Sequence, residues 1–139
     1  MTDKLKIVID TNIIVRAVSG RSLTSFVFDA LFRQEFILCL STEILLEYEE
    51  KLSQIYDTET AELVISVLLM LPNVEKINIY FDFRLIVPDA DDDKFINCTV
   101  SANADYLVSD DKHFRVLSKI QFPKIECLTY EDFRRVLHS

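Results

Sequence analysis

The segment Lys6-Ile7-Val8-Ile9 is followed directly by Asp10-Thr11-Asn12. Its apolar run is typical of a strand buried on both faces, as in a parallel sheet. The pattern returns near the other end of the chain, where Tyr106-Leu107-Val108-Ser109 precedes Asp110-Asp111. Ligands of open α/β sheets bind at the carboxyl ends of the strands, so the two segments predict a shared acidic pocket. Because carboxylates repel one another, such a pocket usually needs a cation.

Strand and helix patterns alternate along the rest of the chain. This alternation predicts an α/β fold, a three-layer sandwich with a central, mostly parallel sheet of four or five strands flanked by helices. We expect one domain that covers residues 1–139. The expected helices are 12–18, 22–33, 41–55, 57–71, 91–103 and 129–137, and the expected strands or extended segments are 5–9, 36–40, 74–87, 105–109 and 124–128.

The composition describes a chain that can build its own core. Half of its residues are hydrophobic, and the three cysteines are far apart and are interpreted as core residues of a reducing compartment. Only two histidines are present, which argues against a histidine-based zinc site. No signal peptide is recognisable and no apolar stretch is long enough to span a bilayer. We therefore expect a soluble, cytoplasmic protein with no membrane partner.

The net charge of −8 argues against indiscriminate binding to nucleic acid, which needs a basic surface. It does not exclude an enzyme whose clustered acids hold metal ions against phosphates, and it also suits a basic partner or simple solubility. The single glycine, Gly20, excludes a Walker A loop, a dinucleotide fingerprint and a kinase glycine loop, because each of these needs several glycines.

Two runs of acids fall on expected helices. On a helical wheel, Glu47 and Glu49 flank the apolar stripe of helix 41–55 on opposite sides, so periodicity does not choose between them. In the run 89–93, Asp92 lies above the apolar face, whereas Asp91 and Asp93 diverge to either side. Acids at a helix start also suit the macrodipole, although three in succession exceed what a cap requires. Asp110 and Asp111 follow the expected strand 105–109, and one of the two should face the ligand crevice at the sheet edge.

Taken together, these segments resemble the PIN domain, the metal-dependent ribonuclease fold found in the toxin of many bacterial and archaeal toxin–antitoxin pairs. The resemblance covers nearly the whole chain and favours Glu47, six residues after Ser41, over Glu49. The third acid falls in the run Asp89-Ala90-Asp91-Asp92-Asp93, where Ala90 replaces a usual proline. At the last motif Asp111 matches the fourth acid, while Ser109 replaces threonine, Asp110 replaces glycine and His113 replaces a usual aspartate.

The resemblance implies metal-dependent hydrolysis of RNA. Asp10, Glu47, Asp92 and Asp111 would be the catalytic acids and would hold Mg²⁺ or Mn²⁺, which prefer oxygen ligands. Asn12, Ser109 and Asp110 would position these acids or contact a phosphate. The expected partners are an RNA substrate, an antitoxin protein and a second copy of the chain. The leucine-rich helix 57–71 and its predecessor could form a hairpin that docks an antitoxin or a second copy, and a core role for this stripe is an equal alternative.

Two other interpretations remain open. Asp10 could be a phosphotransfer nucleophile, although Asn12 stands where such a phosphatase needs a second aspartate and only Lys124 could serve as the lysine of a receiver domain. The chain could also be a degenerate PIN-like module that binds RNA or a partner without cutting. Phosphorylation by acetyl phosphate would test the former, and metal binding without cleavage would indicate the latter.

Overall fold

A computed structural model describes residues 4–19, 25–80, 93–114 and 124–138. The elements follow the expected alternation of strands and helices, and most differ from the sequence-based bounds by only a few residues at their ends. In chain order they are β1 (Lys6–Ile9), α1 (Thr11–Val18), α2 (Phe26–Phe32), β2 (Ile37–Leu40), α3 (Thr42–Ile55), α4 (Thr58–Met70), β3 (Val74–Lys76), α5 (Asp93–Ser101), β4 (Tyr106–Val108), β5 (Cys127–Leu128) and α6 (Tyr130–Leu137).

The strands form a five-stranded sheet in the order β3-β2-β1-β4-β5, and all four pairings are parallel. The chain moves outward from β1 to β2 and β3, and then returns to β4 on the opposite side of β1. The direction of winding therefore changes between β1 and β4. In open α/β sheets this switch point is where a ligand crevice forms.

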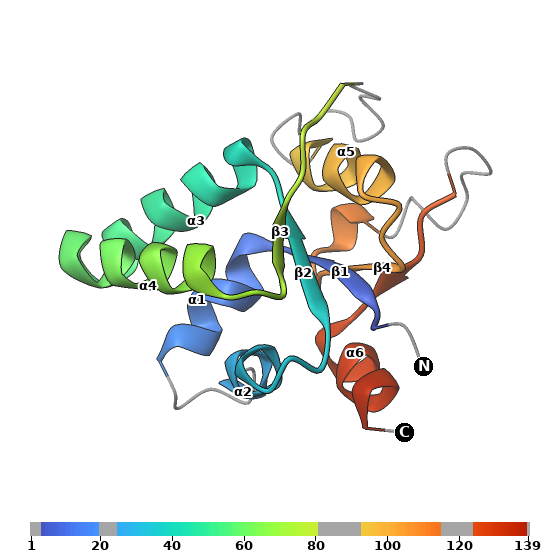
Figure 1. Ribbon diagram of the computed structural model, residues 1–139, viewed down its shortest axis with the longest axis horizontal. Coiled ribbons are helices and arrows are strands. Elements are labelled where there is room, and N and C mark those ends of the chain that lie inside the picture. Colours follow the sequence, from blue (N-terminus) through green and yellow to red (C-terminus); the bar gives the residue numbers. More distant parts are fainter. Residues whose placement is uncertain (1–3, 20–24, 81–92, 115–123, 139) are drawn as a thin grey trace.

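The helices cover the sheet in layers, as expected. Figure 1 shows α1, α3 and α4 together on one side of the strands and α5 on the other. The core between these layers contains the fully buried β1 residues Ile7, Val8 and Ile9. Their burial on both faces of the sheet explains why the first segment reads as a continuous apolar run instead of an alternating one.

Two helix starts are capped by hydroxyl side chains. Ser41 accepts a hydrogen bond from the backbone N–H of Ile44 at the start of α3, and Thr129 caps α6 in the same way. Such caps satisfy backbone donors that have no partner inside the helix. Asp10 and Ser25 differ, because they occupy the N-cap positions of α1 and α2 but their side chains make no capping hydrogen bond.

Some detailed expectations were wrong. Helical periodicity predicts that Phe32 lies on the inward side of helix 22–33 and Ile55 in the apolar stripe of helix 41–55, yet they are 51% and 59% exposed. Periodicity places a residue on a helix face but does not show where the neighbouring element ends, and both residues lie at helix C-termini. The long extended segment contracts to β3, and the part from residue 81 onward lies outside the described residues.

Two absences apply to the described ranges. No helix in them is long and apolar enough to cross a membrane. Cys39, Cys98 and Cys127 form no disulfide, and the first two are buried in the core as expected.

Candidate active site at the carboxyl ends of β1 and β4

Asp10 leaves β1 at the centre of the sheet and is only 6% exposed. Its backbone N–H donates to the carbonyl oxygen of Val108 at 2.9 Å, which continues the pairing of β1 with β4. The register therefore brings Asp10 beside Ser109, the residue that follows β4. Since the Asp10 carboxylate does not cap α1, burial of this charge needs an explanation other than helix capping.

Ser109 connects the two strand ends. Its Oγ donates a hydrogen bond to Oδ2 of Asp10 at 2.8 Å and accepts one from the backbone N–H of Asp111 at 3.0 Å. Ser109 is itself buried. The hydroxyl thus fixes the orientation of the Asp10 carboxylate and the turn that carries Asp111.

The electrostatic environment of Asp10 opposes its negative charge. Burial raises the pKa of the Asp10 carboxyl above its ordinary value of 3.8, the hydrogen bond from Ser109 opposes this increase, and repulsion from Asp111 and Glu47 adds to it. Asp111 and Glu47 are therefore close enough to Asp10 to influence its charge. A cation at this place would relieve both the repulsion and the loss of hydration.

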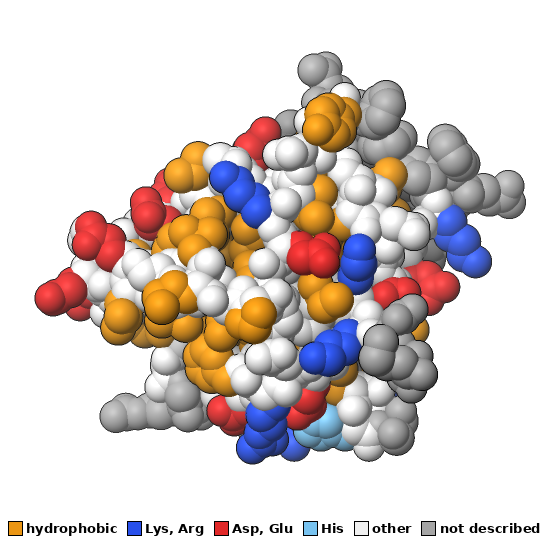
Figure 2. All heavy atoms as spheres, viewed as in Figure 1, with side chains coloured by type: hydrophobic (Ala, Val, Ile, Leu, Met, Phe, Trp, Pro, Cys, Tyr) orange, Lys and Arg blue, Asp and Glu red, His pale blue; other side chains and the backbone are white. Residues whose placement is uncertain are grey.

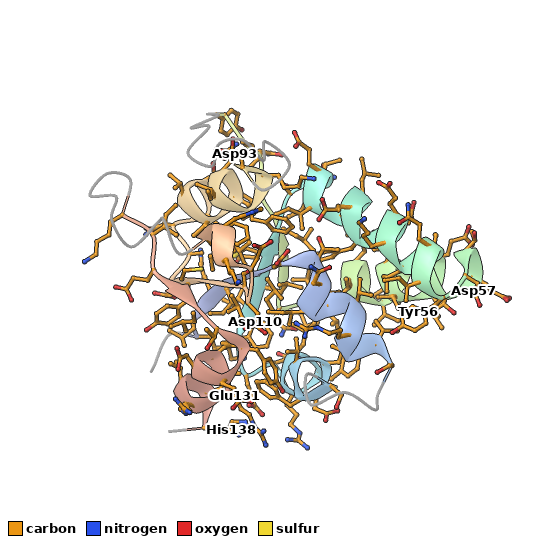
Figure 3. The ribbon with its side chains drawn as sticks, turned by 180° about the vertical axis from the view of Figure 1, so that it is seen from behind. Tyr56, Asp57, Asp93, Asp110, Glu131 and His138 are labelled. Atoms are coloured by element: carbon orange, nitrogen blue, oxygen red, sulfur yellow. The ribbon has the colours of Figure 1, made fainter. Side chains whose placement is uncertain are left out.

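Asp110 and Asp111 have different surroundings. Oδ1 of Asp110 accepts a hydrogen bond from the backbone N–H of Tyr130 at 2.9 Å, and Oδ2 lies 3.4 Å from Nη2 of Arg16. Figure 3 shows Asp110 where α1, β4 and α6 meet. Asp111 is less exposed, and its Oδ1 accepts from the backbone N–H of His113 at 2.9 Å. Asp110 therefore joins structural elements, whereas Asp111 is the acid that repels Asp10.

A pocket of about 390 Å³ opens at these strand ends. Both strand-end acids reach it together with Asp10, so the shared acidic pocket expected from the sequence exists. Asn12 and Arg16 line it from α1, and the Arg16 Nε donates to the backbone oxygen of Asn12 at 3.3 Å. The lining residues are Asp10, Asn12, Ile13, Val15, Arg16, Ile55, Asp110 and Asp111.

Glu47 reaches toward this region from α3. Oε2 accepts a hydrogen bond from the Thr11 hydroxyl, next to Asp10, and Oε1 lies 2.7 Å from Nζ of Lys94 on α5. Helical periodicity left Glu47 and Glu49 equal. In the structure Glu47 joins α1 and α5 to α3. Neither Thr11 nor Lys94 was identified from the sequence, because neither residue type signals chemistry without its partner.

Of the acidic residues in the run 89–93, only Asp93 lies within the described residues. Asp92, the expected third acid, lies outside the described residues. Asp93 begins α5 and is 6% exposed (Figure 3). The helical wheel had directed Asp93 to one side of the apolar face, so its burial is a feature that sequence reasoning missed. A buried acid directly before Lys94 makes Asp93 a second candidate from this run.

The described carboxylates do not surround a single position that a metal ion could occupy. Within the described ranges, no three His, Cys, Asp or Glu side chains are arranged to hold one metal ion together. The donor chemistry nevertheless fits a hard cation, because carboxylate oxygens from β1, β4 and α3 act on one another electrostatically. The ammonium of Lys94 already offsets one of these charges, that of Glu47.

A second hollow, also of about 390 Å³, lies between α1, α2 and α4 and shares no lining residue with the acidic pocket. Hydrophobic side chains gather over the α3–α4 hairpin and its surroundings in Figure 2. Leu63 and Met70 are 65% and 82% exposed there. The hollow is lined by Ala17, Val18, Ser25, Phe28, Asp29, Phe32, Leu63, Val64 and Val67.

Comparison with solved structures finds the same fold. A VapBC2 complex of Rickettsia felis bound to a promoter DNA fragment is 16% identical, covers 90% of this chain and 98% of its own, and has a TM-score of 0.61. VapC20 of Mycobacterium tuberculosis, a toxin that cleaves the sarcin–ricin loop, is 13% identical, with coverages of 79% and 93% and a TM-score of 0.60. The DNA-bound VapBC of Salmonella typhimurium is 14% identical, with coverages of 91% and 98% and a TM-score of 0.57.

Comparison with curated protein sequences gives no match. The sequence model of one family, described as the PIN domain, matches residues 6–113. This match begins at β1, extends beyond β4 and includes each acid considered above. The chain therefore belongs to the PIN domain family.

Proposed function

We propose that this chain is a Mg²⁺- or Mn²⁺-dependent endoribonuclease. The observation that carries the proposal is the buried carboxylate of Asp10, which does not cap its helix and is repelled by Asp111 and Glu47. A fold has little reason to bury one acid beside two other acids at a sheet's switch point unless a cation binds there. Membership of the PIN domain family supports nuclease chemistry at this place and disfavours the phosphotransfer alternative.

Asp10, Asp111 and Glu47, with an acid from the start of α5, would hold the cation. When bound, such an ion lowers the pKa of a water molecule and offsets the charge that develops on a phosphate. Ser109 holds the Asp10 carboxylate in one orientation through its 2.8 Å hydrogen bond. This residue therefore reduces the reorganisation that binding would otherwise require.

Arg16 and Asn12 provide the contacts for substrate. Both line the pocket from α1, and the Arg16 guanidinium is half-exposed beside Asp110. Arginine suits a phosphate because its planar donors can engage two oxygens. The chain carries a net charge of −8, which repels RNA. A local cation such as the Arg16 guanidinium is therefore needed to bind it.

The acid from the start of α5 is Asp92 or Asp93. Asp92 follows from the helical wheel and the resemblance, but it lies outside the described residues. Asp93 is buried at the first turn of α5, the helix that also carries Lys94 to Glu47. We favour Asp93, because it is 6% exposed at the start of the helix whose next residue, Lys94, contacts Glu47.

A toxin role with an antitoxin partner forms the second part of the proposal. Two structures of the same fold are VapBC complexes, and this chain has an apolar hollow beside the exposed Leu63 of α4. An antitoxin helix of opposite charge would bury this surface and match the acidic chain. Co-expression with the product of the adjacent reading frame, followed by size measurement, tests the complex and the expected homodimer together.

RNA cleavage with and without Mg²⁺ or Mn²⁺ tests the central proposal. Asp10→Asn should lower the cleavage rate at least about a hundredfold, because a catalytic ion would lose a buried ligand. Glu50→Gln is the matched control, since Glu50 is an exposed acid of α3. Wild-type cleavage by Asp10→Asn would sink the proposal, and metal binding without any cleavage would favour the RNA- or partner-binding module.

A further inference from the structure

Lys94 and Glu47 form an ion pair with little access to solvent. The Lys94 Nζ lies 2.7 Å from Oε1 of Glu47, and the two side chains are 14% and 19% exposed. Ordinary surface pairs are mobile and screened by salt, but a pair with this geometry and burial is held firmly. The Lys94 ammonium therefore remains at the Glu47 carboxylate instead of pointing into solvent.

The other oxygen of Glu47 is also engaged. Oε2 accepts a hydrogen bond from Thr11, whose neighbour in sequence is Asp10. The Glu47 carboxylate is thus held from α1 and α5 at the same time, and its negative charge still raises the pKa of Asp10. One ammonium accordingly pairs with Glu47, which together with Asp111 repels the buried Asp10.

We propose that Lys94 is an internal counter-ion of this acidic group and competes with the divalent cation for Glu47. The inference rests on the proposed function and concerns how readily the same site takes up its metal. Without metal, the ammonium offsets the charge of Glu47, one of the two acids that repel Asp10. A dication near Glu47 is repelled by that ammonium, so uptake requires the Lys94–Glu47 pair to loosen.

The opposite expectation is that Lys94 only positions Glu47. In that case removal of Lys94 would weaken metal binding, because Glu47 would gain conformational freedom. Ordering a glutamate side chain costs conformational entropy, but only part of this cost would return with Lys94 removed, because Thr11 still holds Oε2 of Glu47. The repulsion between a dication and the Lys94 ammonium would be relieved in full. Loss of the Lys94 charge should therefore tighten metal binding.

Calorimetric titration with Mn²⁺ tests whether loss of the Lys94 charge strengthens or weakens metal binding. Lys94→Gln removes the charge and can still donate a hydrogen bond to Glu47, so we expect it to bind Mn²⁺ about tenfold more tightly than the wild type. Lys94→Arg keeps the charge and should bind within about threefold of the wild type. Lys51→Met removes an exposed lysine from α3 and serves as the control for net charge. Unchanged or weaker binding by Lys94→Gln overturns the inference.

A double-mutant cycle tests the pair without metal or RNA. Urea unfolding with a chelator present should show that Lys94→Gln lowers the midpoint in the wild-type background and has little effect beside Glu47→Gln. Additive effects overturn the counter-ion role. If the wild type binds Mn²⁺ and Lys94→Gln binds no tighter, only this inference fails. If neither binds Mn²⁺, the proposed metal-dependent function fails with it.

Discussion

Ser109 Oγ donates a hydrogen bond of 2.8 Å to Oδ2 of Asp10, although 99 residues separate them. The contact exists because β1 and β4 are neighbours in the sheet, with Ile9 opposite Val108. The same hydroxyl accepts from the backbone N–H of Asp111, so one serine orders both strand ends. Ser109 therefore fixes the orientation of the buried Asp10 carboxylate, which Asp111 and Glu47 repel.

Ser109→Ala should destabilise the fold by about 1–3 kcal/mol, because it removes a hydrogen bond to a buried charged group. Ser109→Thr keeps the hydroxyl and should lose less. Urea unfolding in a chelator measures both. Equal midpoints for Ser109→Ala and the wild type would show that the hydrogen bond contributes nothing to the fold.

Asp10→Asn should make the metal-free protein more stable at neutral pH. The pKa of Asp10 is raised from 3.8 mainly by burial, so the folded state binds the proton more tightly than the unfolded state. The free energy of unfolding therefore falls as pH rises from 3.8 through the raised pKa of the folded state. Asparagine carries no charge and avoids this loss.

The measurement is unfolding of both proteins at several pH values in a chelator. The gap between them should be widest at neutral pH and should narrow toward pH 3.8. Added Mn²⁺ should stabilise the wild type more than Asp10→Asn. A gap that does not depend on pH would show that burial of the Asp10 charge carries no cost.

Asp110→Asn and Asp111→Asn should differ in their effect on metal affinity. The Asp110 carboxylate bonds the Tyr130 N–H and pairs with Arg16, so its substitution should mainly loosen the contact between β4 and α6. Asp111 repels Asp10, and its neutralisation should weaken Mn²⁺ binding at least about tenfold. Calorimetry decides between them, and a larger loss from Asp110→Asn would reverse the assignment.

Asp93→Asn should weaken Mn²⁺ binding more than Asp92→Asn. Asp93 is buried at the start of α5 and Asn is an acceptable residue at a helix start, so a purely structural Asp93 would tolerate the change. The two variants carry the same change in charge and serve as controls for each other. A greater loss in Asp92→Asn would restore the choice made from the helical wheel.

The sequence by itself determined the alternation of elements, because burial on both faces gives an unbroken apolar run such as Ile7 to Ile9 and caps such as Ser41 mark helix starts. The sequence also placed acids at strand ends, because an acid that directly follows an apolar run lies where the strand ends. Motif resemblance, and not periodicity, selected Glu47 and Asp111 from their neighbours.

Only the tertiary structure decided which groups meet. Strand order brought Ser109 to Asp10, and the packing of α5 against α3 brought Lys94 to Glu47. Neither pairing is encoded in a local pattern, because each joins residues far apart in the chain whose approach depends on the whole sheet. Burial of Asp93 is decided in the same way, by the neighbours that α5 meets when it packs on β1 and β4.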